Sequence, residues 1–202
     1  MSLRRLLALL VGALSLSVLI GASGKANAEG GVCGADVSGK NGYTYAGHQA
    51  TDAGHGVRAT IAQVRAPDVT AGHVAGWVGV GGPGQGPNGT DEWLQVGLAT
   101  VPDTAPFLYA EITRPGAQPS FKLVEQGIPL GESRRVAVLE MSGRPNWWRI
   151  WVDGDPVTNP IFLRGSSMRW SPIATAENWN GGQAACNQFS FRFERVSVSQ
   201  GL

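Results

Sequence analysis

Glycine and proline interrupt this chain at short intervals along most of its length. Of its 202 residues, 29 are Gly and 12 are Pro. The runs between them are short and rich in Val, Ile, Thr and aromatic residues, and none keeps the i, i+3, i+4, i+7 apolar spacing of an amphipathic helix. This pattern predicts an all-β fold, an antiparallel β-sandwich of the jelly-roll type with little helix.

The same pattern places the individual strands. We expect strands near residues 42–46, 57–65, 73–80, 92–100, 107–113, 120–124, 134–141, 147–152, 160–164, 173–179 and 188–198. Asp153-Gly154 follows an apolar run and predicts a hairpin turn, because both turn positions must tolerate positive φ. In the last strand the alternation shifts near Arg195, which indicates a β-bulge.

The first 28 residues have the character of a secretory signal peptide. Arg4 and Arg5 precede an apolar run from Leu6 to Ile20, and Ala26-Asn27-Ala28 supplies the small residues that a signal peptidase needs. We therefore expect a secreted protein in which residues 29–202 form a single β-sandwich domain and act as a monomer. A retained single-helix anchor is the alternative, although the apolar run is short for a membrane span.

The net charge argues against a nucleic acid or a lipid surface as partner. The chain holds 16 Lys and Arg against 15 Asp and Glu, and three of the basic residues (Arg4, Arg5 and Lys25) belong to the expected leader. Its removal leaves 13 basic and 15 acidic residues, a net charge of −2. Both kinds of partner need a basic face. We expect neither nucleic-acid binding nor membrane association after processing.

Two cysteines, Cys33 and Cys186, remain in the mature chain. An even number in an exported protein predicts one disulfide between them. A metal site is the alternative, but neither Cys has a second one at ligand spacing. His48, His55 and His73 are widely spaced in Gly-rich sequence, so we expect them to be solvated. No metal or other cofactor is predicted.

Four of the predicted strands (73–80, 92–100, 107–113 and 173–179) alternate apolar residues with polar or aromatic ones. Successive side chains of a strand point to opposite faces. If these strands share a sheet, one face collects Trp77, Trp93, Gln95, Tyr109, Glu111, Glu177 and Trp179. Two carboxylates and an amide among aromatic rings indicate a functional groove. An ordinary solvated sheet face is the alternative.

Glu177 and Gln95 would complete a minimal hydrolytic site on this face. A carboxylate can take a proton from water as general base, and an amide N–H₂ can stabilise the oxyanion that forms on a scissile carbonyl. The other members of the set would line the substrate-binding groove: Trp77, Trp93, Tyr109, Glu111 and Trp179.

Four short motifs on these strands resemble those of the glutamic peptidases, or eqolisins. They are G-W-V-G-V-G-G at 76–82, L-Q-V-G at 94–97, Y-A-E-I-T-R-P at 109–115 and A-E-N-W at 176–179. The resemblance implies a concanavalin A-like sandwich and an endopeptidase that cleaves unfolded or extended polypeptides at acidic pH. It implies a catalytic pair at Gln95 and Glu177, a Trp that supports the glutamine at Trp77, and a further glutamate at Glu111. The chain departs from the family where Asn178 precedes Trp179.

The same face also suits a polysaccharide. Sugar rings stack on aromatic platforms, which could be formed here by Trp77, Trp93, Tyr109 and Trp179 together with Trp147 and Trp151 of a neighbouring hairpin. Glu111 and Glu177 would then be the carboxylate pair of a glycosidase. A non-catalytic carbohydrate-binding module is a further alternative, because one fold supports several functions. Trp148 and Trp170 are expected in the core.

Overall fold

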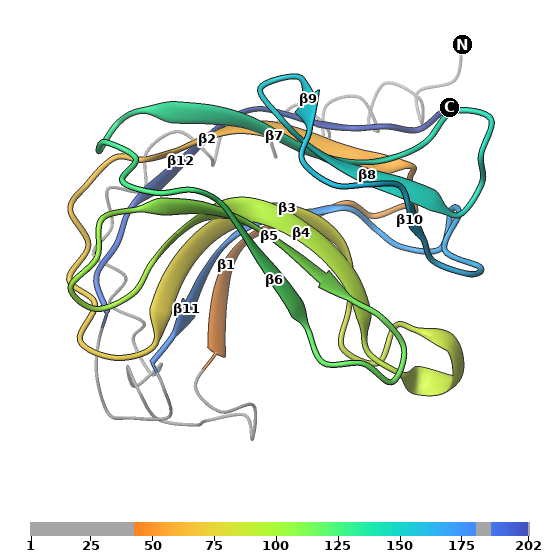
Figure 1. Cartoon of the computed structure of the whole chain (residues 1–202), viewed down its shortest axis with the longest axis horizontal. Helices are drawn as coiled ribbons and strands as arrows, with labels where there is room; N and C mark the ends of the chain where they lie inside the picture. Colours follow the sequence, from red (N-terminus) through yellow and green to blue (C-terminus); the bar gives the residue numbers. More distant parts are fainter. Residues whose placement is uncertain (1–42, 181–186, 202) are drawn as a thin grey trace, which may run out of the picture. The chain divides into compact units, whose positions relative to one another are not determined.

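The computed structural model describes residues 43–180 and 187–201. In this part of the chain two antiparallel sheets stack on each other (Figure 1), which confirms the predicted concanavalin-like β-sandwich. The expected signal peptide, Cys33 and Cys186 lie outside the described residues, so the disulfide stays a prediction. No helix within 43–180 and 187–201 is long and apolar enough to cross a membrane.

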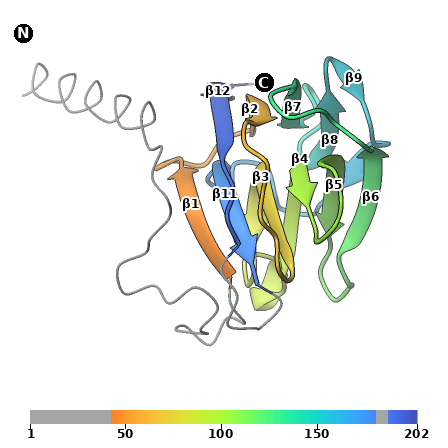
Figure 2. The ribbon, with the colours of Figure 1, turned by 90° about the vertical axis from the view of Figure 1, so that its left-hand side faces the viewer.

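The first sheet, sheet A, carries the candidate site. Its six strands are antiparallel and lie in the order β1–β11–β3–β4–β5–β6, with β1 and β6 at the edges (Figure 2). They are β1 (Tyr43–Gln49), β3 (His73–Gly82), β4 (Glu92–Thr100), β5 (Phe107–Thr113), β6 (Ser120–Glu125) and β11 (Ile173–Trp179). The four strands that were predicted to share a face are therefore direct neighbours.

The second sheet, sheet B, covers one face of sheet A. Its strands lie in the order β10–β8–β7–β2–β12, and β9 pairs with β8. They are β2 (Gly56–Gln63), β7 (Ser133–Glu140), β8 (Trp147–Val152), β9 (Asp155–Pro156), β10 (Ile161–Phe162) and β12 (Phe191–Val198), and a 3₁₀ turn η1 (Pro87–Gly89) lies between β3 and β4. The sequence did not predict β9.

Strand β10 is shorter than the predicted strand at 160–164. Only Ile161 and Phe162 pair with β8. Beyond Phe162 the contact with this segment continues by one hydrogen bond, from the Leu163 N–H to the Asn146 carbonyl at 2.9 Å.

Both local backbone predictions are confirmed. Asp153 and Gly154 have φ values of 51° and 102°, as a tight hairpin turn requires. The pairing of β12 with β2 shifts register between Glu194 and Ser197, and Arg195 between them has a φ of 52°. The bulge therefore lies where the alternation breaks.

The core lies between the sheets and uses every second residue of each strand. Leu94, Val96 and Leu98 of β4 are fully buried against sheet B. Trp148 and Trp170 are 0% and 2% exposed, with ring centroids 6.0 Å apart, which confirms the core position expected for both. Because sheet B packs on this face of sheet A, only the other face of sheet A is available to form a cleft.

A buried carboxylate outside the cleft, Glu140, anchors the β7–β8 connection. Glu140 Oε2 lies 2.6 Å from His55 Nδ1 and accepts from Ser167 Oγ at 3.1 Å, while Oε1 accepts from the Asn146 N–H. The expectation that His55 is solvated is therefore wrong. Its partner is 85 residues away in the sequence, so no local pattern could reveal the pair.

Glu92 gives a first prediction, about stability and pH. Its side chain is buried at the start of β4, and within the described chain Oε2 has no hydrogen-bond partner. Burial raises its pKa, and the positive charge of Arg169 opposes this only in part. A carboxyl with a raised pKa in the folded state contributes stability that is present below its unfolded pKa and lost as the pH rises through the folded value.

We therefore expect Glu92→Gln, a neutral isostere, to raise the Tm by a few degrees at pH 7 and to leave it unchanged below about pH 4, where the wild-type carboxyl is also neutral. Thermal unfolding at both pH values measures this, with exposed Glu132→Gln as the matched control. A lower Tm at pH 7 would show that ionised Glu92 stabilises the fold.

Candidate active site

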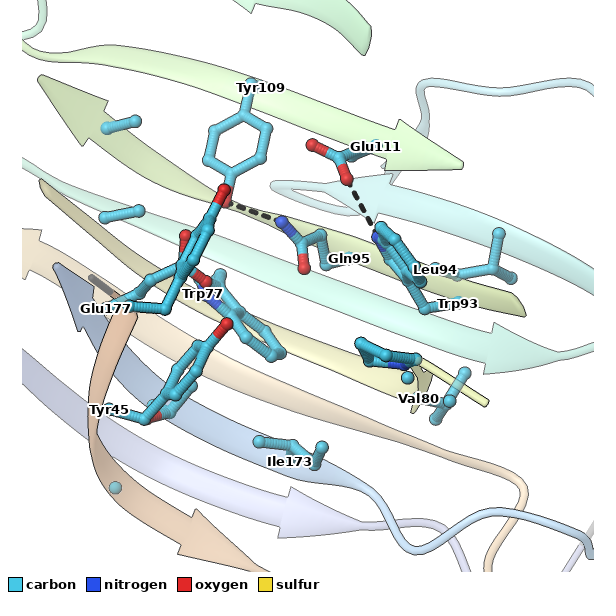
Figure 3. A pocket seen from close by; sticks show the side chains of 18 of the residues that line it. Tyr45, Trp77, Val80, Trp93, Leu94, Gln95, Tyr109, Glu111, Ile173 and Glu177 are labelled. Carbon is cyan, nitrogen blue, oxygen red and sulfur yellow. Dashed lines mark hydrogen bonds between the residues drawn. The ribbon is translucent and has the colours of Figure 1, made fainter. Parts of the chain in front are cut away.

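The face of sheet A that is turned away from sheet B forms a cleft of about 1070 Å³. It is lined by six of the seven residues that the alternation assigned to one face, namely Trp77, Trp93, Gln95, Tyr109, Glu111 and Glu177. The seventh, Trp179, stacks on Tyr43 with ring centroids 5.7 Å apart and is not among the lining residues. Figure 3 shows the labelled side chains rising from four adjacent strands and from β1.

Glu177 is held by two residues of the neighbouring strand. It lies opposite Ala75 in the β11–β3 pair, so His73 and Trp77, two residues on either side of Ala75, are its diagonal neighbours on the same face. His73 Nε2 is 2.7 Å from Oε1, and Trp77 Nε1 donates to Oε2 at 3.0 Å. Glu177 is only 6% exposed. One oxygen is thus fixed by each neighbour, which orients the carboxyl group firmly.

Trp77 supports the glutamate by its hydrogen bond, and not the glutamine as the motif resemblance implied. The indole N–H donates to Glu177, whereas Gln95 is bound by Tyr109. The ring of Trp77 still lies beside Gln95, over Gly79: a Cβ at Gly79 would be 3.0 Å from Gln95 Cβ and 3.2 Å from Trp77 Cζ3. Glycine is needed there chiefly because a Cβ would lie 2.5 Å from the Leu94 carbonyl oxygen of the neighbouring strand.

Gln95 is bound by a buried phenol. Its Nε2 donates to the Tyr109 hydroxyl at 3.1 Å, and the two residues are 9% and 3% exposed. Tyr109 lies opposite Gly97 in the β4–β5 pair, and its ring stacks on Phe121 with centroids 5.4 Å apart. The hydroxyl of Tyr109, rather than its ring face, is therefore directed at the amide (Figure 3).

Glu111 is the second carboxylate of the cleft. It lies opposite Gln95, and one oxygen accepts from Trp93 Nε1 at 2.8 Å. Burial raises its pKa, and the charge of Glu177 raises it further, while the Trp93 hydrogen bond and His73 oppose the shift. The two carboxylates therefore repel each other electrostatically within one site. Glu111 holds its proton to a higher pH than a free glutamate does.

Residues of β1 and β3 that the sequence did not assign to the site complete one wall. His73 was expected to be solvated, which is wrong: it contacts Glu177 and packs at 5.5 Å against Trp179. Tyr43 and Tyr45 of β1 stack on each other with centroids 6.2 Å apart and also line the cleft. The sequence contained a signal for these three residues. His73 alternates in phase with Trp77 in the predicted strand at 73–80, and Tyr43 and Tyr45 alternate in the predicted strand at 42–46, so each pattern could have placed them on one face.

Trp147 and Trp151 do not join this cleft, contrary to the expected sugar platform. Both belong to β8 of sheet B. Trp147 instead stacks under the guanidinium of Arg144, 4.4 Å from its ring centre. No cluster of three or more His, Cys, Asp or Glu side chains that could hold a metal ion occurs among the described residues.

Both the sequence and the structure were compared with known proteins. No family model matches the sequence, and no curated protein matches it. Solved structures that resemble this chain include both glutamic peptidases and β-glucanases, in agreement with the resemblance seen in the motifs.

Three of these structures, two peptidases and one glucanase, show how similar the solved structures are to this chain. Scytalido-glutamic peptidase with a transition state analog inhibitor has a TM-score of 0.52 and 16% identity, over 78% of this chain and 80% of the other. The eqolisin SCP-B with the tripeptide Ala-Ile-His gives 0.49 and 16%, over 77% and 79%. Bacillus licheniformis β-glucanase gives 0.45 and 13%, over 79% and 71%. At 16% identity, the likeness to scytalido-glutamic peptidase shows a shared fold.

Proposed function

We propose that this chain is a secreted glutamic-type endopeptidase that hydrolyses peptide bonds with Glu177 and Gln95 at acidic pH. One observation carries the proposal: a single cleft holds a buried carboxylate fixed by His73 and Trp77 and a buried amide fixed by Tyr109. An anchored base and an anchored oxyanion donor are the two groups that amide hydrolysis needs. A solved glutamic peptidase with the same fold supports this choice of chemistry.

The reaction would begin with an extended polypeptide lying across the cleft. Glu177 takes a proton from a water molecule, whose oxygen attacks the scissile carbonyl carbon. The carbonyl oxygen becomes an oxyanion and accepts a hydrogen bond from Gln95 Nε2. Glu177 then gives the proton to the amide nitrogen, the C–N bond breaks, and the amine leaves. His73 and Trp77 hold the carboxyl group in place through both proton transfers, and no cofactor takes part.

A carbohydrate-active role is the second candidate, and two observations favour it. Glu111 and Glu177 occupy the same cleft, as the acid and the nucleophile or base of a glycosidase do. The rings of Tyr43 and Tyr45 are 37% and 59% exposed at its rim, where they offer faces for sugar stacking. The β-glucanases share the same fold.

Digestion of an unfolded protein between about pH 2 and 7 tests the peptidase. We expect cleavage that favours acidic pH and that resists chelators and serine-protease reagents. Gln95→Ala removes the oxyanion donor and should lower kcat by about 10²–10³.

The matched control is Gln118→Ala, the same substitution at an exposed site outside the cleft, which should keep the wild-type rate. Equal rates for Gln95→Ala and wild type would exclude Gln95 as the oxyanion donor. If wild type leaves protein intact but cleaves or retains a β-glucan, the carbohydrate candidate replaces the peptidase.

A further inference from the structure

The O–H of Tyr109 is a hydrogen-bond donor that has no acceptor in the described part of the protein. Its oxygen accepts from Gln95 Nε2 at 3.1 Å. A phenol both accepts and donates, and in residues 43–180 and 187–201 no protein group accepts the Tyr109 O–H. A buried donor without an acceptor is costly, so its persistence at the floor of a substrate cleft points to an acceptor supplied by the substrate.

This hydroxyl keeps its proton throughout the working pH range. Burial raises its pKa well above 10, and the charges of Glu177 and Glu111 raise it further. The Gln95 hydrogen bond opposes the shift. Tyr109 is therefore a neutral donor under every condition in which Glu177 would act.

The surroundings fix the position of the hydroxyl oxygen. The ring of Tyr109 stacks on Phe121 at an interplanar angle of 12° and meets Phe107 edge-on at 6.5 Å. It also packs in a small apolar cluster with Trp77 and Ala99. Donors that are held rigidly cost no reorganisation when charge develops on the substrate, which makes them effective in catalysis.

We propose that Tyr109 is a further catalytic residue, whose O–H forms a two-donor oxyanion hole with the second N–H of Gln95 Nε2. One substrate oxygen placed beside both groups would accept both hydrogen bonds as it gains negative charge. Tyr109 exchanges no proton with the substrate and forms no bond to it. This inference rests on the proposed peptidase function and deepens it, because it requires a substrate that develops an oxyanion.

Tyr109→Phe tests the proposal, because it removes the hydroxyl and retains the ring that packs on Phe121. Loss of an oxyanion donor should lower kcat by about 10²–10³ with KM little changed. The matched control is Thr100→Val, which removes a buried hydroxyl bound at 2.8 Å to another amide, Gln63, away from the cleft. It should cost stability and leave kcat as in wild type.

A double-substitution experiment separates donation from positioning of Gln95. If Tyr109 only orients Gln95, then Tyr109→Phe has no further effect on Gln95→Ala protein. If Tyr109 is a donor in its own right, the double variant is slower than Gln95→Ala by at least a further tenfold. Equal rates for Gln95→Ala and the double variant would overturn the proposal.

A binding measurement supplies a readout without turnover. A peptide phosphinate carries a tetrahedral anionic oxygen like that of the intermediate, and a peptide of the same sequence does not. On Glu177→Gln protein, which should cleave neither, Tyr109→Phe should weaken phosphinate binding by about 10- to 100-fold and leave peptide binding unchanged. Equal weakening of both ligands would overturn the proposal.

The failures of the two proposals are distinguishable. If wild type hydrolyses peptides and Tyr109→Phe keeps the full kcat, the proposed role of Tyr109 is wrong. The proposed peptidase function is then unaffected. A wild-type protein that neither cleaves peptides nor binds the phosphinate removes both.

Discussion

Glu177→Gln is expected to reduce peptide hydrolysis by about 10²–10⁴, the contribution typical of a positioned general acid–base. Glutamine has nearly the same shape and keeps an oxygen to accept from Trp77, but it cannot take a proton from water or return one to the leaving amine. The loss should therefore appear in kcat rather than in KM. Initial rates on an unfolded protein substrate at several acidic pH values measure it.

The matched control is Glu194→Gln, the same change at a half-exposed residue that pairs with Arg192 on β12. It should retain the wild-type rate. Circular dichroism should show the same β-rich fold for both variants. If Glu177→Gln protein hydrolyses the substrate at the wild-type rate, Glu177 is not the base, and the second carboxylate of the cleft, Glu111, becomes the one to test.

Glu140→Ala is expected to lower the free energy of unfolding by about 3–5 kcal/mol, as the loss of one partner of a buried pair does. The Glu140 side chain has 0% exposure, and its removal leaves His55, the Asn146 N–H and Ser167 Oγ without their acceptor. Each buried group that loses its partner costs about 1–3 kcal/mol. Urea unfolding measures the change as a lower midpoint at constant m-value.

Glu125→Ala is the control for this experiment. Glu125 also pairs with a basic residue, Arg134 at 2.6 Å, but its side chain is 42% exposed. Exposed pairs contribute about 0–1 kcal/mol, so this variant should unfold close to wild type. A similar small loss for Glu140→Ala would show that water or a rearranged loop replaces the carboxylate.

Much of the fold could be read from the chain because its signals are local. Alternation with period two assigns each strand residue to a face, and the glycine and proline breaks bound the strands. Leu94, Val96 and Leu98 had to face the core if Trp93 and Gln95 faced outward, and the structure has this arrangement. The bulge at Arg195 followed from the same alternation.

The partners within the cleft could not be predicted in this way. Alternation indicates which face Trp77 occupies, but not whether its N–H reaches Gln95 or Glu177. That choice depends on the register between β3 and β11, which places Glu177 opposite Ala75 and so between His73 and Trp77. The same reason hid the role of His73: the predicted strand at 73–80 gives its face, but its contact with Glu177 forms only because β11 lies beside β3 in this register.

The sequence by itself therefore determined the fold class, the approximate place of most strands and the face on which Gln95, Glu111 and Glu177 lie. Only the tertiary structure decided that β11 inserts between β1 and β3, far from its neighbours in the chain. The physical reason is that a side chain's face is set by its own backbone, whereas strand order and register are set by packing between distant segments. In this protein that packing gives Glu177 its two anchors and leaves Tyr109 to hold Gln95.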